Sequence, residues 1–174
     1  MSASNERVLI ETDAGNMTVE FFHDKAPGHA KNFLKLAGQG FYDGTRFHRV
    51  ISEFMIQGGD PNTKDGGTGP WGTGGPGYQI DAEFNDVHHE KGILSMARSQ
   101  DPNSAGSQFF VVHGDAAFLD GQYTAFGRVV EGLDILDAIA GAPVEAGGGG
   151  EQSKPLNPVK VVRMTVVAGD EAAQ

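Results

Sequence analysis

Glycine occurs 26 times among the 174 residues of this chain, and this frequency restricts the possible folds more than any other feature. Because glycine favours turns and destabilises the interior of helices and strands, it predicts short elements joined by tight turns and long ordered loops. Between glycines, apolar residues alternate with polar ones over short runs, as in Met17, Val19 and Phe21. Such alternation is typical of β-strands. The sequence therefore predicts a mainly β protein.

Eight runs have the composition of strands. They lie at residues 8–12, 17–22, 46–51, 54–57, 92–97, 108–113, 124–130 and 159–167. The first two runs are joined by Asp13-Ala14-Gly15-Asn16, which is a hairpin signal.

Two helices are expected, far apart in the sequence. Pro27 suits a first helical turn, and an apolar stripe follows at Ala30, Phe33 and Ala37. A second helix is expected at 132–140. Since strands and helices do not alternate regularly, a doubly wound sheet is disfavoured. A closed, antiparallel, eight-stranded β-barrel capped by the two helices fits better.

The long connections between these elements have different expected roles. We expect one domain at residues 7–168, with flexible termini at 1–6 and 169–174. The connections at 60–79, 98–107 and 114–123 are expected to frame a binding groove, because long loops usually carry function. The connection at 141–157 contains four consecutive glycines and is expected to be mobile and dispensable.

Composition excludes several kinds of site. The chain has no cysteine, so disulfides, thiol nucleophiles and thiolate metal sites are impossible. Its 23 acidic and 13 basic residues give a net charge of −10, which opposes binding to nucleic acid or anionic membranes. Residues 1–7 lack the pattern of a signal peptide, and no run approaches the ~20 apolar residues of a membrane span. We expect a cytoplasmic monomer without nucleic-acid or membrane partners.

Arg49 lies in an unusually apolar segment. Strand alternation predicts that it shares a face with Phe47 and Ile51, opposite His48. The same alternation divides the following strand into two faces, Met55 with Gln57 and Phe54 with Ile56. A cation and an amide among large apolar groups can bind an apolar ligand that carries a carbonyl. A proline and its preceding peptide bond fit this description.

Three separated motifs extend this interpretation. They are the segment 47–60, Gly92-Ile93-Leu94-Ser95-Met96-Ala97 and Gly106-Ser107-Gln108-Phe109-Phe110. In this order they resemble the cyclophilins, a family of peptidyl-prolyl cis-trans isomerases, and the resemblance extends over roughly residues 8–167. It implies an eight-stranded barrel with two helices and a substrate groove on its outer surface.

The resemblance also implies the site residues. It assigns catalysis to Arg49, Phe54 and Gln57. It implies substrate-binding residues at Phe54, Met55, Gln57, Ala97, Arg98, Gln108, Phe110, Phe118, Leu119 and Tyr123. Glycines around 72–77 resemble the rim of a second pocket for the residue before proline. No cofactor and no metal are implied.

Three positions depart from the pattern of many eukaryotic members. Phe118 stands where those members have Trp, and Tyr123 where they have His. Arg98 replaces a common Asn. We therefore expect weak affinity for cyclosporin, and the Phe and Tyr choices resemble bacterial members.

The rotation of a peptide bond before proline can be accelerated by a fixed hydrogen-bond donor, and an arginine can supply this donor. The planar amide delocalises the nitrogen lone pair, and rotation must overcome a barrier of ~18–20 kcal/mol. At the twisted transition state the nitrogen becomes a hydrogen-bond acceptor, so a fixed donor such as Arg49 binds that state preferentially. The expected function is acceleration of this rotation in protein substrates, which assists folding.

The sequence is also compatible with other functions. The same groove can hold proline-containing segments as a binding module with little turnover. A purely structural β-barrel would show neither peptide binding nor turnover. Two glycine-rich patterns within 67–77 formally match a dinucleotide motif, but no helical pattern follows them. His88 and His89 are adjacent and cannot easily share one metal from a regular strand.

Overall fold

The computed structural model describes residues 6–147 and 150–168, which form one long antiparallel sheet, two helices and a separate hairpin. The strands are β1 Glu6–Thr12, β2 Gly15–Phe21, β3 Arg49–Ile51, β4 Met55–Gly58, β5 Ile93–Met96, β6 Phe109–Val112, β7 Ala125–Glu131, β8 Val144–Ala146, β9 Gln152–Pro155 and β10 Val161–Ala168. The helices are α1 Pro27–Gly38 and α2 Leu133–Ala140, with short 3₁₀ helices η2 Pro61–Thr63 and η3 Ala117–Leu119.

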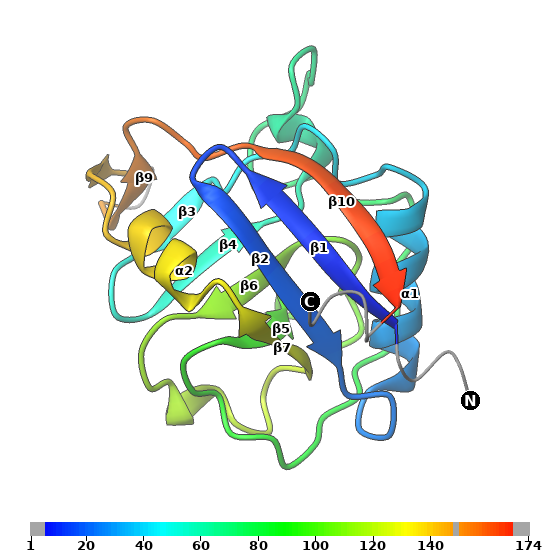
Figure 1. The fold of residues 1–174 in the computed structure, drawn as a ribbon. Coiled ribbons are helices and arrows are strands. Elements are labelled where there is room, and N and C mark those ends of the chain that lie inside the picture. Colours follow the sequence, from blue (N-terminus) through cyan, green and yellow to red (C-terminus); the bar gives the residue numbers. More distant parts are fainter. Residues whose placement is uncertain (1–5, 148–149, 169–174) are drawn as a thin grey trace.

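Eight strands form a curved sheet in the order β10-β1-β2-β7-β5-β6-β4-β3 (Figure 1). The expected eight antiparallel strands and two helices are confirmed. Complete closure into a barrel is not confirmed, because the edge strands β3 and β10 do not pair with each other in this sheet. An isolated bridge between Arg46 and Lys160 connects the segments that precede them. Two backbone hydrogen bonds support it, Phe47 N–H to Val159 O and Val161 N–H to Thr45 O.

Side chains alternate between two faces of the central strands, and each face has its own apolar cluster. Ile56 on β4 and Val111 on β6 belong to the large core inside the curve. Their neighbours Met55 and Phe110 belong to a smaller cluster on the outer face. The outer cluster supports the surface on which the binding groove lies.

The two helices lie at opposite ends of the curved sheet (Figure 1), and both contribute to the inner core. Phe33 of α1 and Leu136 of α2 are fully buried there. The second helix was expected from residue 132, but it begins at Leu133. Gly132 has a φ of 98°, a left-handed conformation outside the helical range, and it forms the turn after β7.

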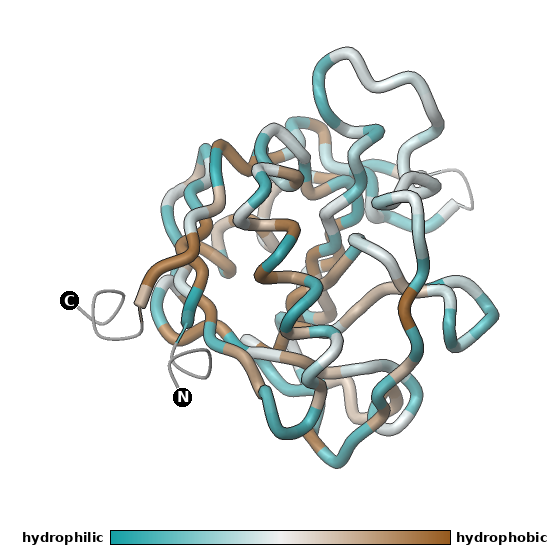
Figure 2. The backbone as a smooth tube through the Cα atoms, turned by 90° about the vertical axis from the view of Figure 1, so that its right-hand side faces the viewer, coloured by the Kyte–Doolittle hydropathy of each residue, from teal (hydrophilic) through white to brown (hydrophobic). Residues whose placement is uncertain are grey.

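The glycine-rich connection between η2 and β5 projects from the body of the molecule. The part that projects furthest carries hydrophilic and near-neutral residues, in contrast to the apolar strands (Figure 2). Asp60 is fully buried at its base, where its carboxylate accepts hydrogen bonds from the Asn62 and Gly72 backbone N–H groups. This carboxylate therefore fixes the loop on both sides of its tip.

Two expectations about mobile segments need correction. Glu6 is paired in β1 with Ala168, so it is not part of a flexible terminus; the rest of the expected flexible ends, 1–5 and 169–174, lies outside the described residues. The connection at 141–157 was expected to be mobile and dispensable, yet its described part forms the paired hairpin β8–β9, in which Glu145 lies opposite Lys154; that it is dispensable stays a prediction. Residues 148–149 of this connection are not described.

Within the described ranges, no helix has the length and apolar character required to cross a bilayer.

Candidate active site

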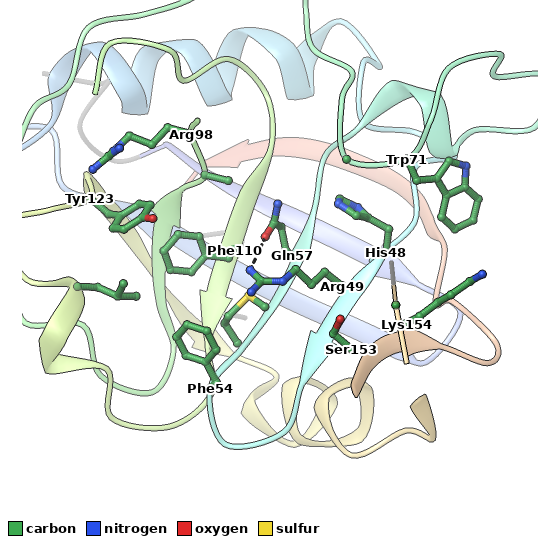
Figure 3. A pocket seen from close by; sticks show the side chains of 15 residues that line it. His48, Arg49, Phe54, Gln57, Trp71, Arg98, Phe110, Tyr123, Ser153 and Lys154 are labelled. Carbon is green, nitrogen blue, oxygen red and sulfur yellow. Dashed lines mark hydrogen bonds between the residues drawn. The ribbon is translucent and has the colours of Figure 1, made fainter. Parts of the chain in front are cut away.

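A groove of about 540 Å³ lies on the outer face of the sheet, over β3, β4 and β6. It is lined by His48, Arg49, Phe54, Met55, Gln57, Trp71, Gly72, Ala97, Arg98, Phe110, Leu119, Tyr123, Gly147, Ser153 and Lys154 (Figure 3). Eight of the ten residues expected to bind substrate are in this set, together with Arg49. The groove is therefore built by segments that are distant in sequence.

One half of the groove is an apolar pocket. Its floor is formed by Met55 and Phe110, which are 1% and 5% exposed. The Tyr123 ring stands edge-on to Phe110 with the ring centres 5.8 Å apart, and Leu119 from η3 lies in the same outer cluster. Phe54 adds a further partly buried wall. This pocket offers a fixed apolar surface that suits a small saturated ring.

A row of polar side chains crosses the groove beside this pocket. Arg49 and Gln57 are direct neighbours on β3 and β4, and the Arg49 Nη1 donates to Gln57 Oε1 at 3.2 Å (Figure 3). Gln57 Nε2 donates to Gln108 Oε1 at 3.2 Å, and Gln108 Nε2 donates to the Gly74 carbonyl at 2.9 Å. This chain of hydrogen bonds, which runs from Gly74 in the loop to the Arg49 guanidinium, fixes the orientation of the side-chain amides of Gln57 and Gln108.

Glu151, just before β9, pairs with the other edge of Arg49. The carboxylate accepts hydrogen bonds from Nε at 3.0 Å and from Nη2 at 3.1 Å. The hydrogen bonds from Arg49 lower the pKa of Glu151 below its usual value, although partial burial acts in the opposite direction. The sequence did not predict this contact, because Glu151 lies in the connection at 141–157, for which no functional role was expected.

The expected facing of side chains around Arg49 was partly wrong. Met55 and Gln57 do share the groove face, opposite the inward Ile56. Phe54 was placed opposite Met55 but lies in the groove with it, because the strand begins only at Met55 and Phe54 belongs to the preceding turn.

A similar correction applies before β3. Phe47 was expected beside Arg49 but is fully buried in the inner core, and His48 lines the groove instead. The regular strand starts at Arg49, so alternation does not extend back to these two residues. Burial lowers the pKa of His48 more than the nearby Asp60 raises it.

A second hollow of about 820 Å³ adjoins the groove. Its lining includes the continuous segment 72–79, together with Gln57, Gln108, Ala97 and Arg98. Gln108, expected to bind substrate, lines this second hollow rather than the groove itself. The hollow lies where glycines 72–77 were expected to form a rim.

Ala97 and Arg98 are held at the boundary between the two hollows. The Ala97 N–H donates to the Gln108 carbonyl at 3.0 Å, so a main-chain contact from Ala97 to a peptide has to use its carbonyl oxygen. The Arg98 guanidinium donates to the Gln122 carbonyl and lies 4.6 Å from the centre of the Tyr123 ring. Arg98 therefore braces the wall of the apolar pocket.

Phe118 does not line the groove, contrary to expectation. Its side chain is 70% exposed because the short helix η3 turns it outward. Its ring packs against Phe54 with the ring centres 5.5 Å apart. Phe118 thus supports the wall from behind.

Sequence reasoning also missed the far end of the groove. His48, Ser153 and Lys154 line it opposite Tyr123, and Trp71 from the glycine-rich loop lies at the same end (Figure 3). The hairpin residues show no alternation or motif that could have predicted this position. Trp71 is the single tryptophan of the chain and directly precedes the glycines at 72–77.

The chemistry available in this groove is hydrogen bonding and apolar contact. In the described part of the chain, no group of three or more His, Asp or Glu side chains is placed to hold a metal ion. A permanent cation beside a pocket of rings can donate to a polar atom of a ligand whose apolar part fills the pocket.

These features define an antiparallel β protein with an apolar groove beside a fixed guanidinium, and comparison with known families identifies its class. The family model for the cyclophilin type peptidyl-prolyl cis-trans isomerase matches residues 7–166. The chain therefore belongs to this family of isomerases.

Individual relatives agree with this assignment. A peptidyl-prolyl cis-trans isomerase of Arabidopsis thaliana is 42% identical over 92% of this chain and 96% of its own length. A probable peptidyl-prolyl cis-trans isomerase of Brucella abortus is 40% identical over 92% of this chain and 82% of its own length. Because relatives of both plant and bacterial origin match, the bacterial character of the groove stays a prediction.

Solved structures show the same fold. A cyclophilin-type isomerase of Cryptosporidium parvum, crystallised in the presence of the dipeptide Ala-Pro, superposes with a TM-score of 0.82. It is 33% identical and covers 93% of this chain and 99% of its own. The cyclophilin AquaCyp293 from Hirschia baltica has a TM-score of 0.75 at 28% identity, with 94% of this chain and 74% of that one covered.

Proposed function

We propose that this chain, a cyclophilin-type peptidyl-prolyl cis-trans isomerase, binds Xaa-Pro segments in the groove and rotates their peptide bond with Arg49 as the catalytic donor. The observation that carries this proposal is that Arg49 and the side chains of Phe54, Met55 and Phe110 line one continuous groove. A proline in the apolar pocket brings its nitrogen toward the guanidinium.

Arg49 acts on the transition state rather than on the bound substrate. In the planar amide the nitrogen lone pair is delocalised and accepts hydrogen bonds poorly; in the twisted amide it is localised and accepts. Differential binding of this kind is what lowers a barrier. A charge-assisted hydrogen bond contributes ~1.5–3 kcal/mol, which corresponds to roughly tenfold to hundredfold in rate.

The apolar pocket supplies the other part of the effect. The twisted amide is less polar than the planar amide, so a surface made of Phe54, Met55, Phe110 and Leu119 favours it. The same surface holds the ring while the preceding carbonyl moves. Gln57 and Gln108 are proposed to hold the substrate backbone, and the hollow along 72–79 is proposed to accept the residue before the proline.

An exchange measurement tests the proposal directly. The rate of cis-trans exchange of an Ala-Pro peptide is measured by NMR with and without the protein, or by a protease-coupled assay. Acceleration at substoichiometric protein supports an isomerase. Binding of the peptide without acceleration supports a binding module instead, and absence of both supports a structural barrel.

We propose flexible or unfolded protein segments that contain proline as the substrates, with assistance of folding as the result. The Cryptosporidium relative crystallised with Ala-Pro supports this substrate class. Cyclosporin is proposed to bind weakly, because Phe118 and Tyr123 replace the Trp and His common in eukaryotic members.

The remaining assignments are also proposals. We propose a cytoplasmic monomer that binds neither nucleic acid nor membranes. A chain without cysteine needs no oxidising compartment to fold, and its net charge of −10 repels anionic surfaces. We propose further that the curved sheet behaves as a closed barrel, and the backbone hydrogen bonds between segments 45–47 and 159–161 support this.

A further inference from the structure

The contact between Glu151 and Arg49 joins the β8–β9 hairpin to the centre of the groove across 102 positions of sequence. Both carboxylate oxygens take part, one with Nε and the other with Nη2, at 3.0 and 3.1 Å. This two-point geometry fixes the plane of a guanidinium as well as its distance, which a single hydrogen bond does not do.

The contact with Glu151 does not use all the hydrogen-bond donors of Arg49. A guanidinium has five N–H bonds. Glu151 accepts from Nε and from Nη2, and Gln57 accepts from Nη1. Among the residues that the structure describes, one N–H on each terminal nitrogen has no hydrogen-bond acceptor, which leaves two donors for a ligand in the groove.

Glu151 is itself held by its backbone. Its carbonyl accepts hydrogen bonds from the Gly147 N–H at 2.7 Å and from the Ser153 hydroxyl at 3.4 Å. Ser153 is buried in the hairpin, whose strand β9 packs beside β3. The carboxylate therefore approaches Arg49 from an anchored segment, and the hydrogen bonds from Arg49 lower its pKa.

We propose that Glu151 is a positioning residue for the reaction: it holds the Nε–Nη2 edge of the Arg49 guanidinium so that the two remaining donors face the bound proline. This inference rests on the proposed function of Arg49. Glu151 does not touch the reacting amide and acts only through the orientation of the cation. If Glu151 instead competed with the substrate for Arg49, removal of its carboxylate would increase activity.

The pair is suited to a clean substitution. The side chains of Arg49 and Glu151 are 37% and 46% exposed, and pairs with this exposure contribute little to the free energy of unfolding. We therefore expect Glu151→Gln to fold with an almost unchanged melting temperature. Glu145→Gln is the matched control, because it removes the same charge from the same hairpin at a site where no contact with Arg49 is seen.

The experiment measures kcat and KM for an Ala-Pro peptide with the parent chain, both Gln variants, and Glu151→Gln combined with Arg49→Lys. We expect Glu151→Gln to lower kcat about threefold to tenfold with little change in KM, well below the ~100-fold that a 1 Å misplacement can cost. Glu145→Gln should match the parent. In the Arg49→Lys background, Glu151→Gln should have no further effect, because the two residues act as one unit.

NMR gives a readout that does not depend on turnover. The Nε proton of Arg49 should exchange slowly with solvent in the parent and rapidly in Glu151→Gln. An active parent with an equally or more active Glu151→Gln variant overturns the inference alone, as does an unchanged Nε exchange rate. An inactive parent overturns the proposed function and this inference together.

Discussion

Arg49 combines partial exposure with a fixed direction, and both properties matter for its proposed role. A fully exposed guanidinium exchanges its hydrogen bonds with water, and a fully buried one cannot meet a substrate. The Arg49 side chain is 37% exposed, at the border between apolar rings and a row of amides. Its planar shape gives it directional donors that a flexible ammonium group lacks.

Replacing Arg49 by Lys should therefore separate charge from geometry. We expect kcat/KM for an Ala-Pro peptide to fall roughly tenfold to hundredfold, while the fold and peptide binding persist. The coupled assay gives the rates, and calorimetry gives the affinity. Equal kcat/KM in variant and parent would contradict the role of Arg49.

A second residue-scale feature is the pair formed by His88 and Asp120, next to Leu119 of the groove. His88 Nδ1 lies 2.6 Å from Asp120 Oδ2, and this bond, with a weaker one to Asp115, raises the pKa of His88 to about 9. The same bond is the main reason why the pKa of Asp120 is lowered to about 2. Both side chains are partly exposed, so the stabilisation is modest.

The sign of each pKa shift predicts how this stabilisation depends on pH. The contribution of His88 is complete below its ordinary pKa of 6.5 and is lost as the pH rises to about 9. The contribution of Asp120 is complete above 3.8 and is lost as the pH falls toward about 2. The difference in melting temperature between the parent and His88→Ala should be largest between pH 3.8 and pH 6.5, where both contributions are complete. It should shrink at lower and at higher pH. A constant difference from neutral to alkaline pH would exclude the pairing.

At the scale of elements, helix α1 begins without a capping side chain of its own. Ala26 at its N-cap offers no acceptor, and the helix starts with Pro27. Glu83, from the connection before β5, accepts hydrogen bonds from the backbone N–H groups of Gly28 at 3.0 Å and His29 at 2.7 Å. A carboxylate at this end also interacts favourably with the helix dipole.

Removal of this distant cap should destabilise the fold without touching the groove. We expect Glu83→Ala to lower the free energy of unfolding by ~1–2 kcal/mol, as measured by urea denaturation. Glu90→Ala is a suitable control, since Glu90 is an exposed residue of the same connection. Equal unfolding midpoints for Glu83→Ala and the control would contradict the capping role.

On the scale of the whole molecule, the sheet separates two apolar clusters with different tasks. Phe109 is fully buried in the inner core, where its ring contacts Phe33, Tyr42 and Phe47. Phe110, the next residue on β6, lies in the outer cluster below the groove. Adjacent phenylalanines thus serve stability and the site respectively.

Substitution of these two residues should resolve the two tasks. Phe109→Ala and Phe110→Ala should each cost ~3–5 kcal/mol of unfolding free energy through the cavity they leave. At a temperature at which both variants are folded, only Phe110→Ala should also lose peptide affinity and kcat/KM. A loss of equal size in Phe109→Ala would show that the outer cluster has no separate role.

The sequence predicted those parts of the structure that depend on local patterns. The eight strands of the main sheet were expected within three residues of their observed limits, because each run has the composition of a strand and turn signals separate the runs. Arg49, Met55, Gln57 and Phe110 were expected together and do line one region.

The parts that could not be predicted depend on contacts between distant segments. Glu151 meets Arg49 across 102 positions, and the hairpin that carries it has no strand-like composition. The Glu83 cap lies 55 positions from its helix. Barrel closure depends on how edge strands meet in space, and the facing of Phe54 depends on where a strand begins. None of these is encoded by a local period.

The loop anchored by Asp60 has a practical consequence. It carries the only tryptophan of the chain to the rim of the groove, with the indole 48% exposed and away from both apolar clusters. Emission from this single tryptophan should change when a peptide excludes water beside it. The molecule therefore contains a natural optical reporter, with which ligand titrations can be followed without any attached dye.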